Sequence, residues 1–442
     1  MKTFMRIVLF VFGTGMLASC GGGGGGGGSS GPPTSGEYVV FAWNDLGMHC
    51  LNPSYDSAVI LPPYNNLWAQ VVRRGNPPEI ITAGVTVEYR IINNTYSYGK
   101  GDYGQFWDNM DDIFGVSLPH DQGLNLVDPD VHNSLSGTML AKADHFEADG
   151  IPVTPLDDDL SWNPYQVAEI TVKDGQGNVL AQTRATVPVS DELHCDKCHE
   201  SAAAPAAPED SYLKIHDEEE GTDLESRTTG FLCASTGCHV SPALGQASQP
   251  AVSYLSRAIH GFHGALDAGE RPACYDCHPG DNTQCSRSLR HTAADGNCET
   301  CHGNLANVAS SIDSGRVPWV GVPDCATCHG GTSIPEVDTG ATRYRDATGH
   351  GGLSCPACHQ SPHAMVPSRE DSDDYQAIQY QKEAVTIGSC AACHSSSRGK
   401  GLDDFEEVHG GTNARRNACH TCHTVVPSEP TKWPHSYKWQ AR

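Results

Sequence analysis

Cysteine and histidine recur in a fixed pattern in the second half of the sequence. Eight times between residues 195 and 423, two cysteines stand close together with a histidine directly after the second. Seven copies read C-x-x-C-H, and the eighth, which begins at Cys233, is stretched to C-x4-C-H. C-x-x-C-H is the attachment signature of c-type haem. Its two thiols form thioethers with the vinyl groups, and its imidazole reaches the iron from the same side. The sequence therefore predicts eight covalently bound c-type haems.

The motif residues have two roles. The predicted thioether cysteines are Cys195, Cys198, Cys233, Cys238, Cys274, Cys277, Cys298, Cys301, Cys325, Cys328, Cys355, Cys358, Cys390, Cys393, Cys419 and Cys422. The histidines predicted to bind iron from the motif side are His199, His239, His278, His302, His329, His359, His394 and His423. Zinc knuckles and disulfides also use paired cysteines, but neither needs a histidine directly after the second one. Only 22 of 442 residues are histidine, so chance does not explain eight such positions.

The second axial ligand of each iron separates an electron carrier from an enzyme. After residue 190 the only methionine is Met365, whereas ten histidines lie outside the motifs. These candidate distal ligands are His194, His216, His260, His263, His291, His350, His363, His409, His420 and His435. Ten candidates for eight irons allow bis-histidine ligation throughout, which gives low-spin haems of low potential. His260 and His263 stand at i and i+3 of a predicted helix, so they are expected to serve two adjacent haems. The alternative for each candidate is a surface histidine or a propionate partner.

The first residues resemble an export signal. Residues 1–20 combine basic Lys2 and Arg6 with an apolar stretch too short for a permanent membrane span. The stretch ends in Leu-Ala-Ser-Cys20, which resembles a bacterial lipobox, and residues 21–36 form a Gly/Ser/Pro tether. We therefore expect lipidation of Cys20 and anchoring at the outer membrane, on its periplasmic or cell-surface side. The alternative is an ordinary signal peptide with an incidental cysteine.

Two cysteines and the net charge bear on compartment and partners. Of 19 cysteines, only Cys50 and Cys285 belong neither to a motif nor to the lipobox. They either pair in an oxidising compartment or remain buried thiols. The formal net charge is −25, which argues against nucleic acid as a partner because nucleic acid requires clustered Lys and Arg. Acidity keeps an exported protein soluble, and it would also steer a basic redox protein or a cationic metal species toward the surface.

The sequence changes texture near residue 190, which predicts a mixed fold of two domains. Residues 37–190 contain β-branched and aromatic runs at 38–43, 67–72 and 85–92, and a hairpin over 165–189, typical of a β-sandwich-like domain. Residues 95–107 are expected to form a long exposed loop. His49 either reaches a metal or packs in a turn, and the acidic run Asp157–Asp159 either holds calcium or is solvated.

Residues 191–442 are expected to form an irregular octahaem cytochrome c domain. These 252 residues carry eight motifs, about 32 residues for each. So little polypeptide does not wrap each haem separately, so packed macrocycles must form most of the apolar core. Short helices joined by Gly/Pro/Ser loops are the expected scaffold. The sequence thus predicts a continuous row of haems and a domain that needs its cofactors to fold.

The motif density, the lipobox and segments such as Cys274–Cys285 and Cys358–His363 resemble outer-surface multihaem c-type cytochromes of metal-reducing bacteria. The resemblance implies transfer of electrons through mostly bis-histidine haems to other redox proteins or extracellular acceptors. Two alternatives remain. One is a multihaem reductase of a nitrogen or sulfur oxyanion, with an open haem at the stretched motif near Arg257 or Arg290. The other is a homopolymeric cytochrome filament. An electron carrier without chemistry of its own is the leading hypothesis.

Overall fold

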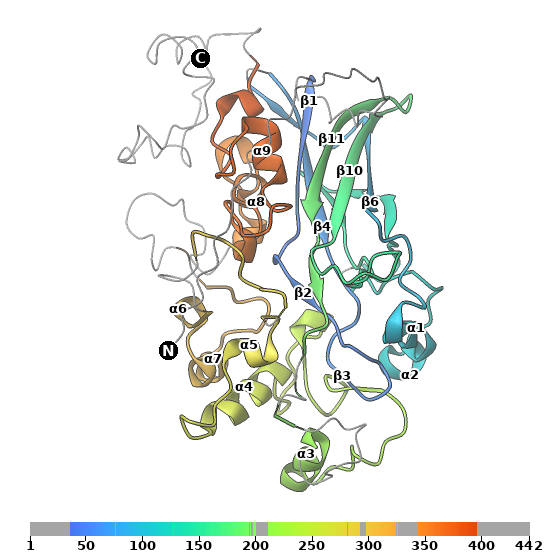
Figure 1. The fold of residues 1–442 in the computed structure, drawn as a ribbon, viewed down its shortest axis with the longest axis vertical. Coiled ribbons are helices and arrows are strands. Elements are labelled where there is room, and N and C mark those ends of the chain that lie inside the picture. Colours follow the sequence, from blue (N-terminus) through green and yellow to red (C-terminus); the bar gives the residue numbers. More distant parts are fainter. Residues whose placement is uncertain are drawn as a thin grey trace, which may run out of the picture. The chain divides into compact units, whose positions relative to one another are not determined.

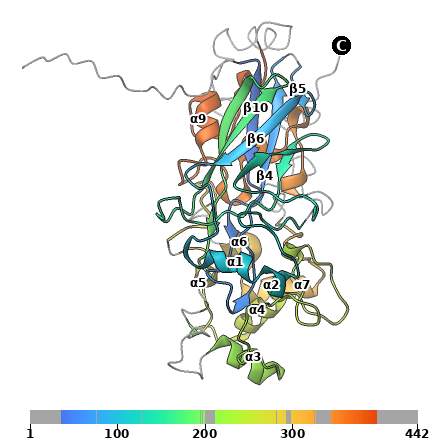
Figure 2. The ribbon, with the colours of Figure 1, turned by 90° about the vertical axis from the view of Figure 1, so that its right-hand side faces the viewer.

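The first half of the chain folds into antiparallel sheets. The computed structural model describes residues 36–395 except 76, 127, 194, 196–197, 200–210, 281, 292–297, 324 and 326–342, all within one compact unit. The strands are β1 (Tyr38–Trp43), β2 (His49–Cys50), β3 (Ala58–Val59), β4 (Leu67–Arg73), β5 (Glu79–Ile81), β6 (Val85–Ile91), β7 (Ser136–Thr138), β8 (Leu140–Ala141), β9 (Phe146–Ala148), β10 (Val167–Asp174), β11 (Val179–Thr186), β12 (Val189–Ser190) and β13 (Phe231–Leu232). One sheet has the order β1-β4-β9-β8 with β5 beside β4, and another has the order β11-β10-β6-β7 (Figures 1 and 2).

These two sheets share one apolar core. Val40 of β1 and Val71 of β4 belong to the same buried cluster as Val87 of β6 and Ile170 of β10, and all four are fully buried. Each such side chain contributes about 1.5–3 kcal/mol by leaving water. The alternating strand patterns of the sequence arise from this packing, as the expected sandwich-like domain requires. The domain limit at residue 190 stays a prediction, because strands on both sides of it pair with the first half of the chain. β12, which ends at that limit, pairs with β2. β13, which lies beyond the limit, pairs with β3.

The second half consists of short helices and irregular segments. The helices are α1 (Gln105–Asp108), α2 (Met110–Phe114), α3 (Tyr212–Glu220), α4 (Leu255–Ala265), α5 (Cys274–Cys277), α6 (Cys298–His302), α7 (Leu305–Asp313), α8 (Cys355–His359) and α9 (Tyr375–Gln381), of which only α1 and α2 precede residue 190. Figure 1 shows α4 beside α7, and α8 and α9 beside the sheets. In the described part of the chain, no helix has the length and apolarity needed to cross a membrane.

β1 is apolar on both faces because it lies between the sandwich core and the motif region. Val39, Phe41 and Trp43 form a second cluster with Ala357 of α8. The ring of Phe41 meets that of Tyr380 edge to face, with centroids 5.2 Å apart. A strand covered on both sides reads as an unbroken apolar run, which is the pattern that residues 38–43 show.

Side chains of α9 satisfy backbone groups at the outer edges of both sheets. Gln376 accepts from the Ala42 amide at 2.9 Å and donates to the Ala42 carbonyl. The Tyr380 hydroxyl donates to the Val40 carbonyl. On the other sheet, Gln379 donates to the Gln182 carbonyl at 2.8 Å. One short helix therefore covers an edge of β1 and of β11 together.

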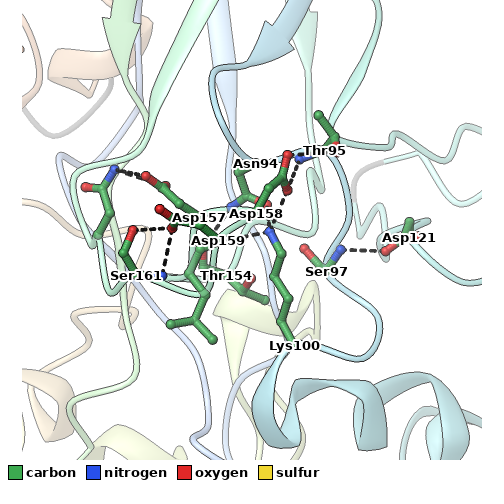
Figure 3. Close-up of polar contacts among 12 residues, drawn as sticks. Asn94, Thr95, Ser97, Lys100, Asp121, Thr154, Asp157, Asp158, Asp159 and Ser161 are labelled. Carbon is green, nitrogen blue, oxygen red and sulfur yellow. Dashed lines mark hydrogen bonds and ion pairs between the residues drawn. The ribbon is translucent and has the colours of Figure 1, made fainter.

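The segment 95–107 is not an exposed loop, and that prediction is wrong. Tyr103 and Phe106 lie in buried clusters, and Lys100 is fully buried. Figure 3 shows Lys100 reaching into the loop that carries the acidic run, where its ammonium donates to Asp158 and to Asn94 at 3.0 and 2.9 Å. Polar side chains in this segment hydrogen-bond to buried turns. The composition of a segment does not distinguish such side chains from polar side chains that face solvent.

The acidic run is likewise bound up in protein contacts. Asp157 accepts from the Gln166 amide group at 2.8 Å, and Asp159 accepts from the backbone of Ser161 at 2.9 Å. Asp158 accepts from the backbone amide of Thr95 at 2.9 Å as well as from Lys100. Each carboxylate therefore orders a neighbouring loop segment in the lower part of the sandwich.

Candidate haem-binding site

A large cavity runs along the described motifs. Its volume is about 3520 Å³, whereas a pocket for one drug-sized ligand occupies about 300–1,000 Å³. The cavity is lined by Cys195, Cys198, His199, His216, Cys233, Cys238, His239, His260, His263, Cys274, Cys277, His278, His291, Cys298, Cys301, His302, Cys325, Cys355, Cys358, His359, His363, Cys393 and His394. The volume and the lining suit several macrocycles side by side.

Four motif histidines each face a histidine from outside the motifs. The ring centroids are 6.2 Å apart for His199 and His263, 6.3 Å for His239 and His216, 6.1 Å for His278 and His260, and 6.2 Å for His302 and His363. All four non-motif partners are among the predicted distal ligands. These pairs involve the motifs that begin at Cys195, Cys233, Cys274 and Cys298.

The spacing within each pair is that of two imidazoles on one metal. A metal–imidazole bond is about 2.1 Å long. With ring bonds of about 1.35 Å, the nitrogen lies about 1.2 Å from the ring centre. Two imidazoles on opposite sides of one metal therefore have centres about 6.5 Å apart. The observed 6.1–6.3 Å agrees closely, although direct aromatic contacts cover about 4.5–7 Å as well.

Hydrogen bonds to Nδ1 favour the first of these two interpretations. His260 Nδ1 lies 2.6 Å from the Ser256 carbonyl, and His263 Nδ1 lies 2.9 Å from the Ile259 carbonyl. A carbonyl oxygen only accepts, so both Nδ1 atoms carry the proton and both Nε2 atoms keep a lone pair. Imidazoles that bind metals are held in this way, with the other nitrogen donating to an oxygen. The arrangement suits axial ligands of iron.

His216 is oriented in the same way, by a hydrogen bond from Nδ1 to a hydroxyl. Its Nδ1 lies 2.9 Å from Thr222 Oγ1. That hydroxyl donates its proton to Asp217, so it accepts the Nδ1 proton of His216. At the fourth pair, His363 Nδ1 lies 3.8 Å from Cys285 Sγ. His216, His260 and His263 thus each keep a lone pair on Nε2, and His363 also hydrogen-bonds to the backbone of Leu46.

α4 positions two of these ligands. The helix places His260 and His263 one turn apart, where they face the motif histidines His278 and His199. α4 packs closely on α7, because a side chain at Gly264 would lie 2.8 Å from the backbone of Ala306. The expectation that the i, i+3 pair serves two motifs agrees with this geometry.

The stretched motif reaches the same arrangement by a turn. Cys233 follows β13, and its amide donates to the Val59 carbonyl at 2.9 Å. The extra residues form a turn in which Cys238 N donates to Ser235 O at 3.0 Å and Gly237 has a φ of +86°. Only glycine adopts that conformation without strain. The loop brings His239 opposite His216 despite the longer spacing.

Burial keeps the imidazoles of His278 and His302 neutral. Burial, followed by the neighbouring histidines, lowers the pKa of His278 to about 4. Burial, then His363 and Arg316, lowers the pKa of His302 to about 4. Neutral imidazole is the form that binds a metal. These two motif imidazoles are therefore in the metal-binding form at neutral pH.

Neighbouring motifs lie close to one another. After burial, which has the largest effect, the Cys195 thiol raises the pKa of both Cys233 and Cys277. Cys274 hydrogen-bonds to Cys298, and Cys358 influences the pKa of Cys393. Chain-distant motifs therefore adjoin in two groups. His363 stands four residues after His359, the histidine of the motif that begins at Cys355. Because His363 faces His302, it connects the two groups.

The segment Asn44–Cys50 supports the site instead of binding a metal through His49. His49 Nε2 lies 3.0 Å from Asp45, which also pairs with Arg345 at 3.2 Å. His49 is buried in this ion-pair network, as the packed-turn interpretation expects. A side chain at Gly47 would lie 3.2 Å from the His363 Cβ. The segment between β1 and β2 thus packs directly on the candidate ligand His363.

Cys50 and Cys285 adjoin this ligand but are not joined by a disulfide. Burial, then the nearby Cys285, raises the pKa of Cys50 above its usual range. Burial also raises the pKa of Cys285 to about 11. Whether they pair or remain free thiols in the protein stays a prediction.

Several predicted residues lie outside the part that the structure describes. They are Cys20, His194, Cys328, His329, His409, Cys419, His420, Cys422, His423 and His435, together with the side chains of His350 and Cys390. Among the described residues, no group of three or more His, Cys, Asp and Glu side chains is arranged to hold a metal ion. The sequence patterns did not predict that Ser256, Ile259, Thr222 and Cys285 contact the distal imidazoles.

Comparisons with known proteins add little to this geometry. No known protein family and no curated protein matches the chain. Among solved structures, the chain is similar to the crystal structure of MtrC from Shewanella baltica OS185, with 11% identity and a TM-score of 0.14. The alignment covers 66% of this chain and 43% of that chain, so this chain spans less than half of that length. At that TM-score the two folds do not superpose closely, and function rests on the site itself.

Proposed function

We propose that the protein is a c-type cytochrome with eight haems that carries electrons at the cell envelope, in extracellular electron transfer. The observation that supports this most is the set of four imidazole pairs, each with one member from a haem motif and a centroid spacing of 6.1–6.3 Å. Each pair would hold one haem iron between its two imidazoles. Bound haem supplies one-electron chemistry, and closed axial positions favour electron transfer over substrate binding.

The chain's own residues have simple tasks in this proposal. Cysteines anchor each macrocycle, carbonyls and hydroxyls orient the distal imidazoles, and the short helices leave the macrocycles in mutual contact. The proximity of Cys195 to Cys233 and Cys277 supports an uninterrupted row of haems.

The stretched motif does not favour the reductase alternative. An open haem there would need a free distal position, yet His216 faces His239. Arg257, considered as an anion ligand, is engaged with Asp313 through two contacts of 3.0 Å. Electron transfer without substrate chemistry therefore remains the better supported function.

The experiment that tests the function combines haem counting with spectroscopy. A pyridine haemochrome assay and mass spectrometry of the purified protein should show eight covalent haems. The oxidised protein should give only low-spin EPR signals, and the reduced protein should form no carbon monoxide complex. A high-spin haem that takes up carbon monoxide would instead support a reductase, with nitrite, hydroxylamine and tetrathionate as first substrates to screen.

Location and partners complete the proposal. We expect lipidation at Cys20 to anchor the protein to the outer membrane, with other redox proteins or extracellular acceptors as partners. Metabolic labelling with a radioactive fatty acid tests the anchor, and Cys20→Ala is the control that should lose the label. Length-dispersed fibres in negative stain would support a homopolymer instead.

A further inference from the structure

The imidazole of His216 is connected to a carboxylate through its hydrogen-bond acceptor. Its Nδ1 donates to the Thr222 hydroxyl at 2.9 Å, and that hydroxyl donates to the Asp217 carboxylate at 2.5 Å. The same carboxylate accepts from the backbone amides of Leu224 and Glu225 at 2.7–2.9 Å, which fixes its position. A single hydroxyl therefore joins this distal imidazole to a negative charge.

The acceptors of the other three distal imidazoles are neutral groups. His260 and His263 donate to backbone carbonyls of their own helix. His363 hydrogen-bonds to the backbone of Leu46, and its Nδ1 lies 3.8 Å from the Cys285 sulfur. Among the distal imidazoles that the structure describes, the connection to a carboxylate therefore distinguishes His216.

A charged group behind the acceptor changes the imidazole as a ligand. Hydrogen bonds to an ionised group are strong, and a hydroxyl that donates to a carboxylate becomes a better acceptor itself. A strong acceptor on Nδ1 makes the imidazole a more basic ligand. A more basic ligand stabilises ferric over ferrous iron, because the ferric ion carries the extra positive charge. Hydrogen bonding around a ligand is one of the means by which proteins set haem potentials. The hydrogen-bond chain from His216 to Asp217 thus makes the potential of its haem more negative.

Charges around the pairs act in the same direction. Burial lowers the pKa of His239, the partner of His216, and the exposed carboxylate of Glu220 opposes that shift. At two other pairs the nearby charge is positive, because Arg316 joins burial in lowering the pKa of His260 and of His302. A negative field favours ferric iron, and a positive field disfavours it.

We propose that Asp217, acting through Thr222, gives the haem held by His216 and His239 the most negative reduction potential of the four haems whose axial pairs are described. This inference rests on the proposed function, since it requires haem at the stretched motif. α3 lies at one end of the molecule (Figures 1 and 2), and the adjoining motif is the one that begins at Cys195. An electron that a reduced redox protein delivers here therefore moves to the ferric haem of that motif. One iron is oxidised and the other reduced, with no proton or bond change.

Substitutions in the hydrogen-bond chain should shift one potential. Thr222→Val removes the hydroxyl, and Asp217→Asn removes the charge while keeping an oxygen that accepts. Each should shift the most negative potential in the positive direction, and Thr222→Ser should leave it in place because serine keeps the hydroxyl. Spectroelectrochemical titration of the full-length haem-loaded protein measures the shifts. Glu218→Gln is the matched control, since it removes a neighbouring exposed charge that pairs with Lys214 and lies outside the chain of hydrogen bonds. It should shift the potential less than Asp217→Asn does.

Spectroscopy separates an effect on the iron from a purely structural one. The Thr222→Val and Asp217→Asn proteins should keep only low-spin EPR signals. A high-spin haem in either variant, unchanged potentials, or an equal shift in Glu218→Gln would overturn the proposal. His216→Ala should convert one haem to a high-spin form that binds carbon monoxide, and the component missing from the low-spin titration should be the most negative one. If a different component disappears, the assignment is wrong. Absence of haem from the wild-type protein would instead refute the proposed function, and haem content is measured first for that reason.

Discussion

Replacing Arg287 by methionine should lower the free energy of unfolding by about 3–5 kcal/mol, because it leaves a buried carboxylate without its partner. Arg287 is 1% exposed and donates twice to Asp373, at 2.9 Å each. Asp373 is 6% exposed, and its contact with the Ser368 hydroxyl supplies no charge. Arg287 also donates to the Gly47 carbonyl, which would lose that donor. Guanidinium denaturation of the haem-loaded protein, followed by circular dichroism and Soret absorbance, measures the loss.

The double variant Arg287→Met/Asp373→Leu separates charge from packing. Replacing both members of a buried ion pair by apolar residues is often neutral or stabilising, so the double variant should recover most of the loss. Arg257→Met is the surface control. It breaks an ion pair whose side chains are 44% and 53% exposed, and such pairs contribute about 0–1 kcal/mol. A loss below about 1 kcal/mol for Arg287→Met, or equal losses for the single and double variants, would refute the reasoning.

Three further predictions concern the site and its support. His263→Ala should open one iron, at the motif that begins at Cys195, so one low-spin EPR signal disappears and one carbon monoxide complex forms; unchanged spectra would show that His263 is not a ligand. Gly47→Ala should cost about 1–3 kcal/mol, since φ is +90° and the new Cβ would lie 3.2 Å from the Cβ of His363; denaturation should show the loss and EPR a change at one haem. Burial, assisted by nearby carboxylates, raises the pKa of Asp149 to about 7. This group therefore lowers the free energy of unfolding progressively as pH rises from about 4 to 7. Asp149→Asn should stabilise the protein above pH 7 by at most about 4 kcal/mol and should have little effect near pH 4. Equal effects at both pH values would contradict the last prediction.

Local sequence patterns predicted the parts of this protein that depend on neighbouring residues. Side-chain type and spacing within a few residues indicate the strand at 38–43, the hairpin 165–189 and the haem motifs. The i, i+3 relation of His260 and His263 was predictable for the same reason, because a helix fixes it.

Partnerships between distant residues were beyond sequence reasoning. Nothing in the spacing of the histidines indicates that His363 faces His302, because sixty residues lie between them in the sequence. The burial of Lys100 was not predicted, because the sequence does not distinguish a polar side chain that satisfies buried turns from one that faces solvent. Ten candidate ligands could be named, but the choice among them depends on tertiary packing.

The covering of β1 and β11 by α9 has a consequence for self-association. A strand edge with unpaired amides and carbonyls is a template on which another chain can add by backbone pairing. Gln376 and Tyr380 occupy those groups on β1, and Gln379 occupies a carbonyl on β11. A second copy that tried to extend either sheet there would first have to displace the helix. Growth of cross-β aggregates from these edges is therefore blocked, and copies of this chain that associate must meet through other surfaces.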